Sequence, residues 1–414
     1  MHVTRKRTLK DTDQLRRLAR ASGDLWSRIT KWHWRLVDRQ DYWISQYDMQ
    51  TFQVDGNDDL HSHSAQAVAG QFYQALQSWR QKEDPDCRPP YKQKKFNKVV
   101  WKSSAIRVKG GRLRLSNGRG NDPVWIEGWT HRKPRRVEII WQNGERQLRA
   151  QYQVEPHSEP KGDKTAGIDL GEIHLAAAFD GEKTITINGR ELRSKRRYQN
   201  KLKAKLDTKI DRKKRGSNRW WKLVKTKKKQ LAKIRNQITD ILHKTSTRLI
   251  ATLHERGVST VVLGDLRGIR DRIDYGPKAN QRLHQWAHAK FAHMLTYKAR
   301  LSGMAVERVS EAFTSQTCPD CGHPHKPSGR NYTCPSCGVV YHRDATGAIN
   351  IRRKYLSNTR TVVADRADSV HTDSAHMASA SASLRGVKYR PHMLCSSGSR
   401  RSTATALHRS LAAA

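Results

Sequence analysis

The sequence contains no apolar run of the roughly 18 to 20 residues that a membrane-crossing helix needs. Its amino-terminal segment, MHVTRKRTLK, is positively charged, but the apolar stretch of a secretory signal does not follow it. An amphipathic lipid anchor is also missing. These absences argue against a membrane protein or an exported one, and they predict an intracellular protein.

Acidic residues are scarce as well. The chain has 38 Asp and Glu against 80 Lys and Arg, which gives a formal net charge of +42. Because so large an excess of like charge repels itself, a polyanionic partner is expected, and nucleic acid is the natural candidate. The length of 414 residues suits two or three domains rather than one.

Cysteine is concentrated in one short segment. Four of the six cysteines form two Cys-x-x-Cys knuckles, CPDCG and CPSCG, separated by twelve residues. Four thiolates at this spacing close a tetrahedral site with no open position, which is typical of structural zinc. The pattern predicts one Zn²⁺ ion held by Cys318, Cys321, Cys334 and Cys337.

The first part of the chain changes its hydrophobic period twice. Residues 1–10 suit a single strand, and the apolar positions of residues 15–79 then follow helical spacing. The segment DPDCRPP has the composition of a hinge. From residue 106 to residue 154 the period is two, and the QNGE turn predicts a tight hairpin in this β-rich segment.

A new unit begins near residue 164 with TAGIDLGEIHLAAAFDG, which predicts a strand, a turn and a second strand. Residues 190–235 carry 21 Lys and Arg against three acids, in two helical stretches separated by a Gly-Ser pair. A strand, TVVLGDL, a helix around residues 286–301 and a further strand at 305–309 follow. From about residue 357 the Ser, Ala, Thr and Arg-rich composition predicts a disordered tail.

Three acids stand where the fold could bring them together. Glu311 lies seven residues before Cys318, and Asp344 lies seven residues after Cys337, so the two ends of a ribbon insert would carry both. Asp169 ends the GID strand. In so basic a chain, three clustered acids would hold two divalent ions about 3.5 to 4 Å apart for phosphodiester hydrolysis.

Each acid also has a structural interpretation. Asp344 precedes an apolar helix and would be a good N-cap. Asp169 stands before Leu-Gly and could be a turn residue, and Glu311 could be a solvated charge at a sheet edge. The residues alone leave both interpretations open.

The order GIDLG, VVLGDL, TSQTCPDCG with CPSCG, and RDATGAINI resembles the split RuvC-type nuclease of the TnpB family. These transposon-encoded RNA-guided endonucleases are related to Fanzor proteins and to type V CRISPR effectors. The motifs cover residues 164–355, about half of the chain. The resemblance implies a multidomain α+β fold: a RuvC-like RNase H nuclease core with a zinc-ribbon insert, and an N-terminal β-barrel wedge module interrupted by a helical recognition lobe.

The resemblance also assigns the segments. It implies a wedge barrel at 1–10 and 88–160, a recognition lobe at 11–87, a nuclease domain at 161–314 and 342–356, a zinc ribbon at 315–341 that binds target nucleic acid, and a basic tail at 357–414. The implied partners are a guide RNA from the protein's own locus and a double-stranded DNA target, in the nucleoid region of a bacterial or archaeal cytoplasm. The oligomeric state stays open.

Two departures from the family pattern bear on the site. Many members place a catalytic Glu in the second motif where this chain has Gly264, followed by Asp265. Some relatives use a Glu just ahead of the Thr-Ser-Gln-Thr-Cys motif instead, which is the position of Glu311. The resemblance therefore implies Asp169, Glu311 and Asp344 as ligands of two Mg²⁺ ions, with Asp265 as the alternative. The second departure, Thr346-Gly347 in place of Asn-Ala, leaves Asp344 intact.

The cationic helical segment is expected to grip nucleic acid through phosphates, without reading sequence. Two tryptophans inside it could stack on bases or pack in a core. The candidate nucleic-acid-binding residues are Arg196, Arg197, Arg212, Lys213, Lys214, Arg215, Trp220 and Trp221.

Three functions compete at this point. The first is an RNA-guided, metal-dependent DNA endonuclease of a transposable element. The second is a nuclease-inactive RNA-guided DNA-binding protein that acts as a transcriptional repressor, but decay of catalysis would not preserve both Asp169 and Asp344. The third, a basic zinc-ribbon RNA-binding protein, explains the charge and the zinc but not the three acids.

Overall fold

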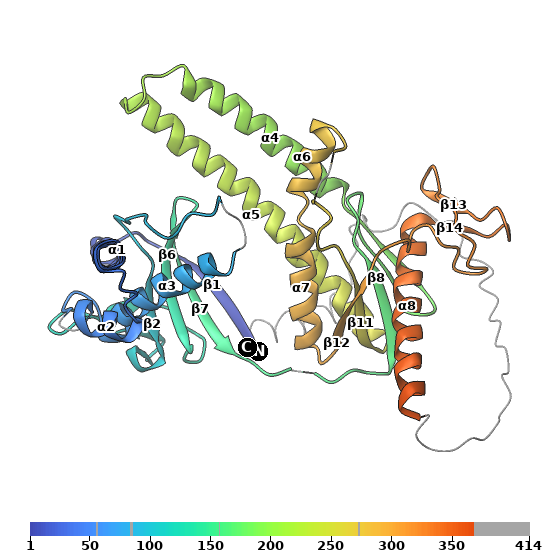
Figure 1. Ribbon diagram of the computed structural model, residues 1–414, viewed down its shortest axis with the longest axis horizontal. Helices are drawn as coiled ribbons and strands as arrows, with labels where there is room; N and C mark the ends of the chain where they lie inside the picture. Colours follow the sequence, from blue (N-terminus) through green and yellow to red (C-terminus); the bar gives the residue numbers. More distant parts are fainter. Residues whose placement is uncertain (55–56, 83–85, 157, 272–273, 368–414) are drawn as a thin grey trace. The chain divides into compact units, whose positions relative to one another are not determined.

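The computed structural model describes residues 1–54, 57–82, 86–156, 158–271 and 274–367. The chain divides into two compact units, Met1–Glu155 and the residues from Pro156 onward (Figure 1). The division falls five residues before the expected boundary between residues 160 and 161. None of the described helices combines the length and the apolar content that a membrane-crossing segment needs.

The first unit begins with one strand and three helices: β1 (His2–Leu9), α1 (Asp13–Gln40), α2 (Gln46–Gln53) and α3 (Ser62–Arg80). The Thr12 hydroxyl caps α1 by accepting a hydrogen bond from the Leu15 amide. The apolar stripes of α1 and α3 face each other, and the rings of Trp26 and Phe72 meet edge to face at 5.8 Å. The helical period found in the sequence is therefore confirmed for this segment.

The β-rich segment of the first unit forms two separate sheets. One has the order β1-β7-β6-β2, and the other has the order β3-β4-β5. Asn143 and Gly144 both adopt positive φ, as the tight turn between β6 and β7 requires. The strand bounds are β2 (Val99–Lys102), β3 (Ile106–Lys109), β4 (Arg112–Leu115), β5 (Val124–Ile126), β6 (Arg136–Gln142) and β7 (Glu145–Gln153).

The closed barrel expected from the sequence is not formed by the described strands of the first unit. Within the described part of the first unit, no ladder of paired strands joins the four-stranded sheet to the three-stranded one. The break falls after β2, where the 3-10 turn η1 (Ser103–Ala105) separates β2 from β3. Since β2 offers only four residues for pairing with β6, the chain leaves that sheet and starts a new one. A period of two showed strands but could not show whether their sheet closes.

The second unit is built on one five-stranded sheet of order β10-β9-β8-β11-β12. β8 pairs antiparallel with β9, and β9 with β10, whereas β8, β11 and β12 run parallel. The carboxyl ends of β8, β10, β11 and β12 therefore lie at one edge. The strands are β8 (Lys164–Asp169), β9 (His174–Phe179), β10 (Thr184–Asn188), β11 (Val258–Asp265) and β12 (Ala305–Ser310).

Helices cover both faces of this sheet (Figure 1). α5 and α7 bury their apolar stripes against one face, together with Ile168 and Leu263. α8 packs on the other face, where Ala348 and Ile349 meet Phe179. The helices are α4 (Arg190–Asp211), α5 (Asn218–Glu255), α6 (Pro277–Gln285), α7 (His288–Leu301) and α8 (Arg343–Ala367), and a small ribbon of β13 (Asn331–Thr333) and β14 (Val340–His342) precedes α8.

The tail prediction needs a second correction. α8 continues to Ala367, so the first part of the segment expected to be disordered, 357–367, is helical. The low apolar content of this stretch hid the helix, because it extends a helix whose earlier turns are anchored by burial of Ala348 and Ile351. The remainder, 368–414, lies outside the described residues.

Candidate active site

Strand alternation places the acids on the face of the sheet that α8 covers. Ala166 and Ile168 of β8 point into the core on the α5 and α7 side, so Asp169 points to the opposite face. Gly264 lies on the same face, since Val261 and Leu263 of β11 point into that same core. Ile168 is paired with Leu263 in these parallel strands, so Asp169 and Gly264, one residue further along, are neighbours at the carboxyl edge of the sheet.

Glu311 reaches this point from the next strand. Val309 of β12 is paired with Gly264, and Glu311 comes two residues later, on the same face. A Cβ added at Gly264 would lie 1.9 Å from the Oε1 atom of Glu311 and 2.4 Å from its Cδ. The carboxylate of Glu311 therefore occupies the space that a side chain at position 264 would need.

α8 brings the third acid. Its backbone lies so close to β8 that a Cβ at Gly167 would be 2.2 Å from the Ala348 carbonyl oxygen. One residue earlier in the helix, a Cβ at Gly347 would meet the Oδ2 atom of Asp169 at 2.7 Å. Small residues at both positions let the first turn of α8, which carries Asp344, lie against Asp169.

Burial and mutual repulsion perturb two of these carboxyls. Burial, followed by the charge of Asp344, raises the pKa of Asp169 to about 7. Burial, followed by the charges of Asp169 and Asp265, raises the pKa of Glu311 to about 8. Carboxyls that resist ionisation next to one another are typical of sites completed by cations.

Asp344 is held in its charged form by its neighbours. Burial works to raise its pKa, but a hydrogen bond from His174 and the charges of His342 and Arg330 outweigh burial, so this pKa lies below its usual value. His174 Nδ1 lies 2.5 Å from Asp344 Oδ2, and Arg330 Nη1 lies 3.4 Å from the same oxygen.

The N-cap interpretation of Asp344 is wrong, because Asp344 stands inside the first turn of α8. Its backbone N–H instead donates to His342 Nδ1. The sequence reading also missed His174. Its signal was the GEIH tetrapeptide, which puts this side chain at the start of β9, beside the strand that ends in Asp169.

Asp265 is placed differently. It follows Leu263 by two residues, so alternation directs it toward the face opposite to Asp169. Its carboxylate accepts hydrogen bonds from the Arg267 side chain, at 2.7 Å, and from the Arg267 amide. The hydrogen bond from the Arg267 side chain is the main cause that holds the pKa of Asp265 below its usual value. Asp265 is thus already paired with the cationic side chains of Arg267 and Arg308, whereas Glu311 has no such partner among the described residues.

The acid cluster suits divalent cations. Glu311 Oε1 is buried and has no hydrogen-bond partner among the described residues. A buried carboxylate oxygen left in this state is costly, and a hard cation would relieve that cost. All three candidate ligands offer oxygen atoms, the donors that Mg²⁺ prefers.

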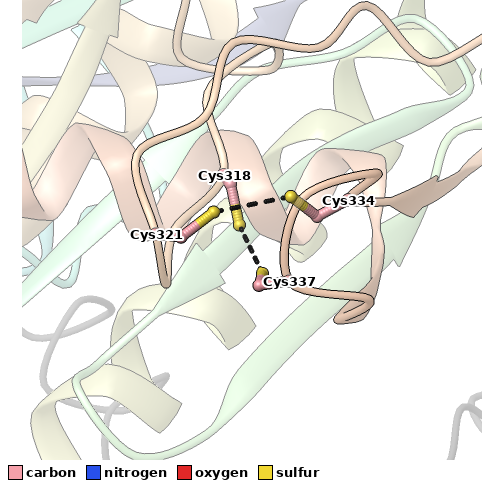
Figure 2. A group of neighbouring side chains, drawn as sticks. All are labelled: Cys318, Cys321, Cys334 and Cys337. Atoms are coloured by element: carbon pink, nitrogen blue, oxygen red, sulfur yellow. Dashed lines mark hydrogen bonds between the residues drawn. The ribbon is translucent and has the colours of Figure 1, made fainter.

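The four cysteines of the ribbon converge, as Figure 2 shows. Their sulfur atoms all lie within 4.8 Å of one another. The pairs Cys318–Cys337 and Cys321–Cys334 are 3.6 and 3.5 Å apart, close to the edge of about 3.8 Å that a tetrahedron of 2.3 Å metal–sulfur bonds has.

The two knuckles repeat one backbone geometry. Gly322 N–H donates to the Cys318 carbonyl, and Gly338 N–H donates to the Cys334 carbonyl, both with positive φ at the glycine. The prediction that the two Cys-x-x-Cys knuckles are equivalent and converge is therefore confirmed.

The cationic residues lie along the hairpin of α4 and α5. Arg196 and Arg197 are on α4, and the other four basic candidates are Arg212 to Arg215 in the turn that joins the helices. Trp220 and Trp221 meet edge to face at 4.6 Å near the start of α5. Trp221 is 49% exposed, so its ring is not a core residue.

Comparisons with known proteins find similarity to TnpB-like and Cas12f proteins. A family model described as a probable transposase of the OrfB type matches residues 149–270, and a model of the Cas12f1-like TNB domain matches residues 288–351. A TnpB-like protein of Methanocaldococcus jannaschii is 30% identical over 45% of this chain and 67% of its own length. The Cas12f1 endodeoxyribonuclease of Syntrophomonas palmitatica is 26% identical over 47% of this chain and 39% of its own length.

A solved structure shares the fold. The cryo-EM structure of a Cas12f1–sgRNA–target DNA complex matches with a TM-score of 0.53 over 81% of each chain, at 12% sequence identity.

A TnpB-like protein of Acidianus two-tailed virus is 29% identical, and the chain spans 43% of its length. The chain thus spans less than half of two of these three sequence relatives.

The raised pKa values predict how stability depends on pH. Without Mg²⁺, folded Asp169 and Glu311 keep protons up to about pH 7 and 8, whereas an unfolded chain releases them near pH 4. The folded state binds more protons in this window, so its stability falls as pH rises. Glu311→Gln should therefore raise the melting temperature by at least about 2 °C at pH 8.5 and change it little at pH 5.

The measurement is calorimetry of protein dialysed free of Mg²⁺ without a chelator, which leaves the cysteine site intact. Glu307→Gln, an exposed residue of β12, the strand that Glu311 follows, is the matched control and should shift the melting temperature at neither pH. An equal shift for Glu311→Gln at both pH values would contradict the assignment of buried, mutually repelling acids.

Proposed function

Because the chain belongs to the TnpB-like family, we propose that it is an RNA-guided DNA endonuclease of a transposable element. The observation that carries the proposal is the placement of the Glu311 carboxylate over Gly264, beside Asp169. A decayed site would have no reason to refill the space left by the missing second-motif acid.

The second unit serves as a RuvC-like nuclease core. Its sheet, in which three antiparallel strands, β8, β9 and β10, are followed by two strands parallel to β8, supports an RNase H type of fold. The expected segments at 161–314 and 342–356 form this core, and the ribbon at 315–341 is its target-nucleic-acid-binding insert. Residues 1–10 and 88–160 make the wedge module around the helical recognition lobe at 11–87.

Asp169, Glu311 and Asp344 hold two Mg²⁺ ions. When bound, such ions supply an activated water and stabilise the leaving oxygen of the phosphodiester. The protein's part is to fix the three carboxylates, with Gly264 and Gly347 leaving room for them. His174 and Arg330 orient Asp344 through its Oδ2 atom.

The cysteine cluster holds zinc as a structural ion. Four thiolates fill a tetrahedral shell, so no position is left for a substrate. The metal fixes the ribbon between the segment after Glu311 and the start of α8, which helps to keep two of the three acids in register.

A guide RNA and a double-stranded DNA target are the partners. The net charge of +42 and the basic α4–α5 hairpin suit a polyanion bound through its phosphates. Base pairing with the guide then selects the target, which requires no sequence-reading side chains on the hairpin. The structural neighbour, captured with guide RNA and target DNA, supports this assignment.

The alternative is a nuclease-inactive, RNA-guided repressor. Retention of Asp169 and Asp344 and the position of Glu311 favour the enzyme. Guided DNA binding that Asp169→Ala leaves unchanged, with no cutting by the wild type in Mg²⁺, would identify the repressor.

The first test concerns the third ligand. With guide RNA, Mg²⁺ and plasmid target, Asp169→Ala and Glu311→Ala should each lower the cleavage rate at least about 100-fold, because each removes a metal ligand. Asp265→Ala should stay within about tenfold of wild type, since Asp265 is paired with Arg267. The reverse order of Glu311 and Asp265 would move the site to Asp265.

The second test exchanges the origin of the carboxylate. Gly264→Ala alone should disable the enzyme, because the new Cβ takes the space of the Glu311 carboxylate. The double variant Gly264→Glu with Glu311→Gly should cut at least about tenfold faster than Glu311→Gly, since it returns an acid to the same space. An inert double variant that folds and binds the guide would refute this equivalence.

The third test concerns zinc. Metal analysis of the purified protein should give about one zinc per chain. Cys321→Ser should lose it, whereas Cys87→Ser, outside the cluster, should keep it. A wild-type protein without zinc would refute the structural ion.

A further inference from the structure

A pocket of about 570 Å³ opens in the second unit, lined by residues of α4 and α6. Six Lys and Arg line it against a single acid, together with the ring of Trp286. The residues that matter here are Glu172, Arg193, Arg196, Lys201, Arg282 and Trp286.

Topology puts the pocket at the same edge as the acids. Glu172 follows Asp169 by three residues, so their Cα atoms lie at most about 11 Å apart. The wall on α4 follows the end of β10, and the wall on α6 follows the end of β11. Both strands run parallel to β8, so both walls rise from the edge where the acids stand.

The positive charge of the pocket is largely uncompensated. Glu172 is shared by Arg193, at 3.5 Å, and Arg282, at 3.9 Å. Arg196 has no carboxylate partner among the described residues, although burial lowers its pKa. A desolvated guanidinium without an acid is costly, and a phosphate would relieve that cost.

The Trp286 indole forms the apolar side of the pocket, and neighbouring groups hold it in place. Arg270 Nη2 donates to the Trp286 carbonyl at 2.6 Å, and the Trp286 ring packs against the core of the second unit. Two amide hydrogen bonds between Asn200 and Gln285, of 3.0 and 2.9 Å, tie α6 to α4. The Trp286 Nε1–H is buried without a partner among the described side chains.

These features together fit one nucleotide. The volume lies in the range of small-ligand pockets and is too small for a duplex, whose major groove alone is about 12 Å wide. Arg196 offers a phosphate site, and an indole face next to basic groups is the usual platform for an unpaired base. The closeness of Glu172 to Asp169 favours the strand that lies over the acids as its source.

We propose that this pocket holds an unpaired nucleotide of the DNA strand that is cut, with its base against Trp286 and its phosphate at Arg196. The proposal rests on the proposed function and deepens it, because it names a positioning site for the cleaved strand. Loss of the ring should weaken strand binding and leave the acids in place.

The test is photocrosslinking from 5-iodo-2′-deoxyuridine placed at successive positions of the target strand. Asp169→Asn protein carrying the guide RNA binds the DNA without cutting it, and mass spectrometry locates the adduct. One or two adjacent positions should crosslink to the peptide that contains Trp286. Trp286→Phe should keep the crosslink, Trp286→Leu should lose it, and Trp141→Leu, an exposed tryptophan of the first unit, should have no effect.

Kinetics on a pre-opened target add a second readout. Trp286→Leu and Arg196→Gln should each raise KM about tenfold with kcat within about twofold. Lys244→Gln, which removes a surface cation paired with Asp240, should change neither. A fall in kcat with unchanged KM in Trp286→Leu would overturn the positioning role. So would a melting temperature that falls as much in Trp286→Phe as in Trp286→Leu.

A further arm separates this proposal from the proposed function. It uses guide-free wild-type protein and a short single-stranded oligodeoxynucleotide that carries the same base. Crosslinking to Trp286 without guided cleavage supports the pocket and counts against the guided nuclease. Guided cleavage without crosslinking refutes the pocket alone, and crosslinking only from 5-iodouridine in the guide shows that the pocket holds RNA and overturns the proposal.

Discussion

The second unit depends on one electrostatic constraint: carboxyl groups that repel each other must share the edge of the sheet at which its parallel strands end. Burial and their mutual charge raise the pKa of Asp169 to about 7 and that of Glu311 to about 8. The fold accepts this cost because close packing of α8 on β8 fixes the backbone beneath the acids. Such stored electrostatic strain is what a cation-binding site offers to its ions.

Small residues make that arrangement possible. Gly167 lets the α8 backbone reach β8, Gly347 leaves room for Asp169, and Gly264 leaves room for Glu311. At position 264 the absence of a side chain leaves the space that the Glu311 carboxylate occupies. The acid is supplied by the neighbouring strand, and the atoms that face Asp169 are still carboxylate oxygens.

Two features lie next to the acids in the chain: the cysteine cluster and the basic pocket. The cysteine cluster fixes the segment between Glu311 and Asp344 as a compact ribbon. On the α4 and α6 side, basic residues outnumber acids around a pocket that begins three residues beyond Asp169. A cluster of acids flanked by positive charge suits the proposed substrate, a strand whose phosphates would be held on either side of the acids.

Local information was enough for much of this protein. Periods of two and of 3.6 located the strands and helices, the spacing of the knuckles located the cysteine cluster, and motif order named the family. It was not enough for closure of the first-unit strands, for the helical extent of α8 beyond residue 356, or for His174 beside Asp344. Each of these depends on which segments meet in space. The choice between Asp265 and Glu311 is of the same kind. The sequence by itself determined that Asp265 stands at the end of one strand and that Glu311 stands shortly after the strand at 305–309. Only the tertiary structure decided which of them faces Asp169, because strand alternation and register set the direction of a side chain.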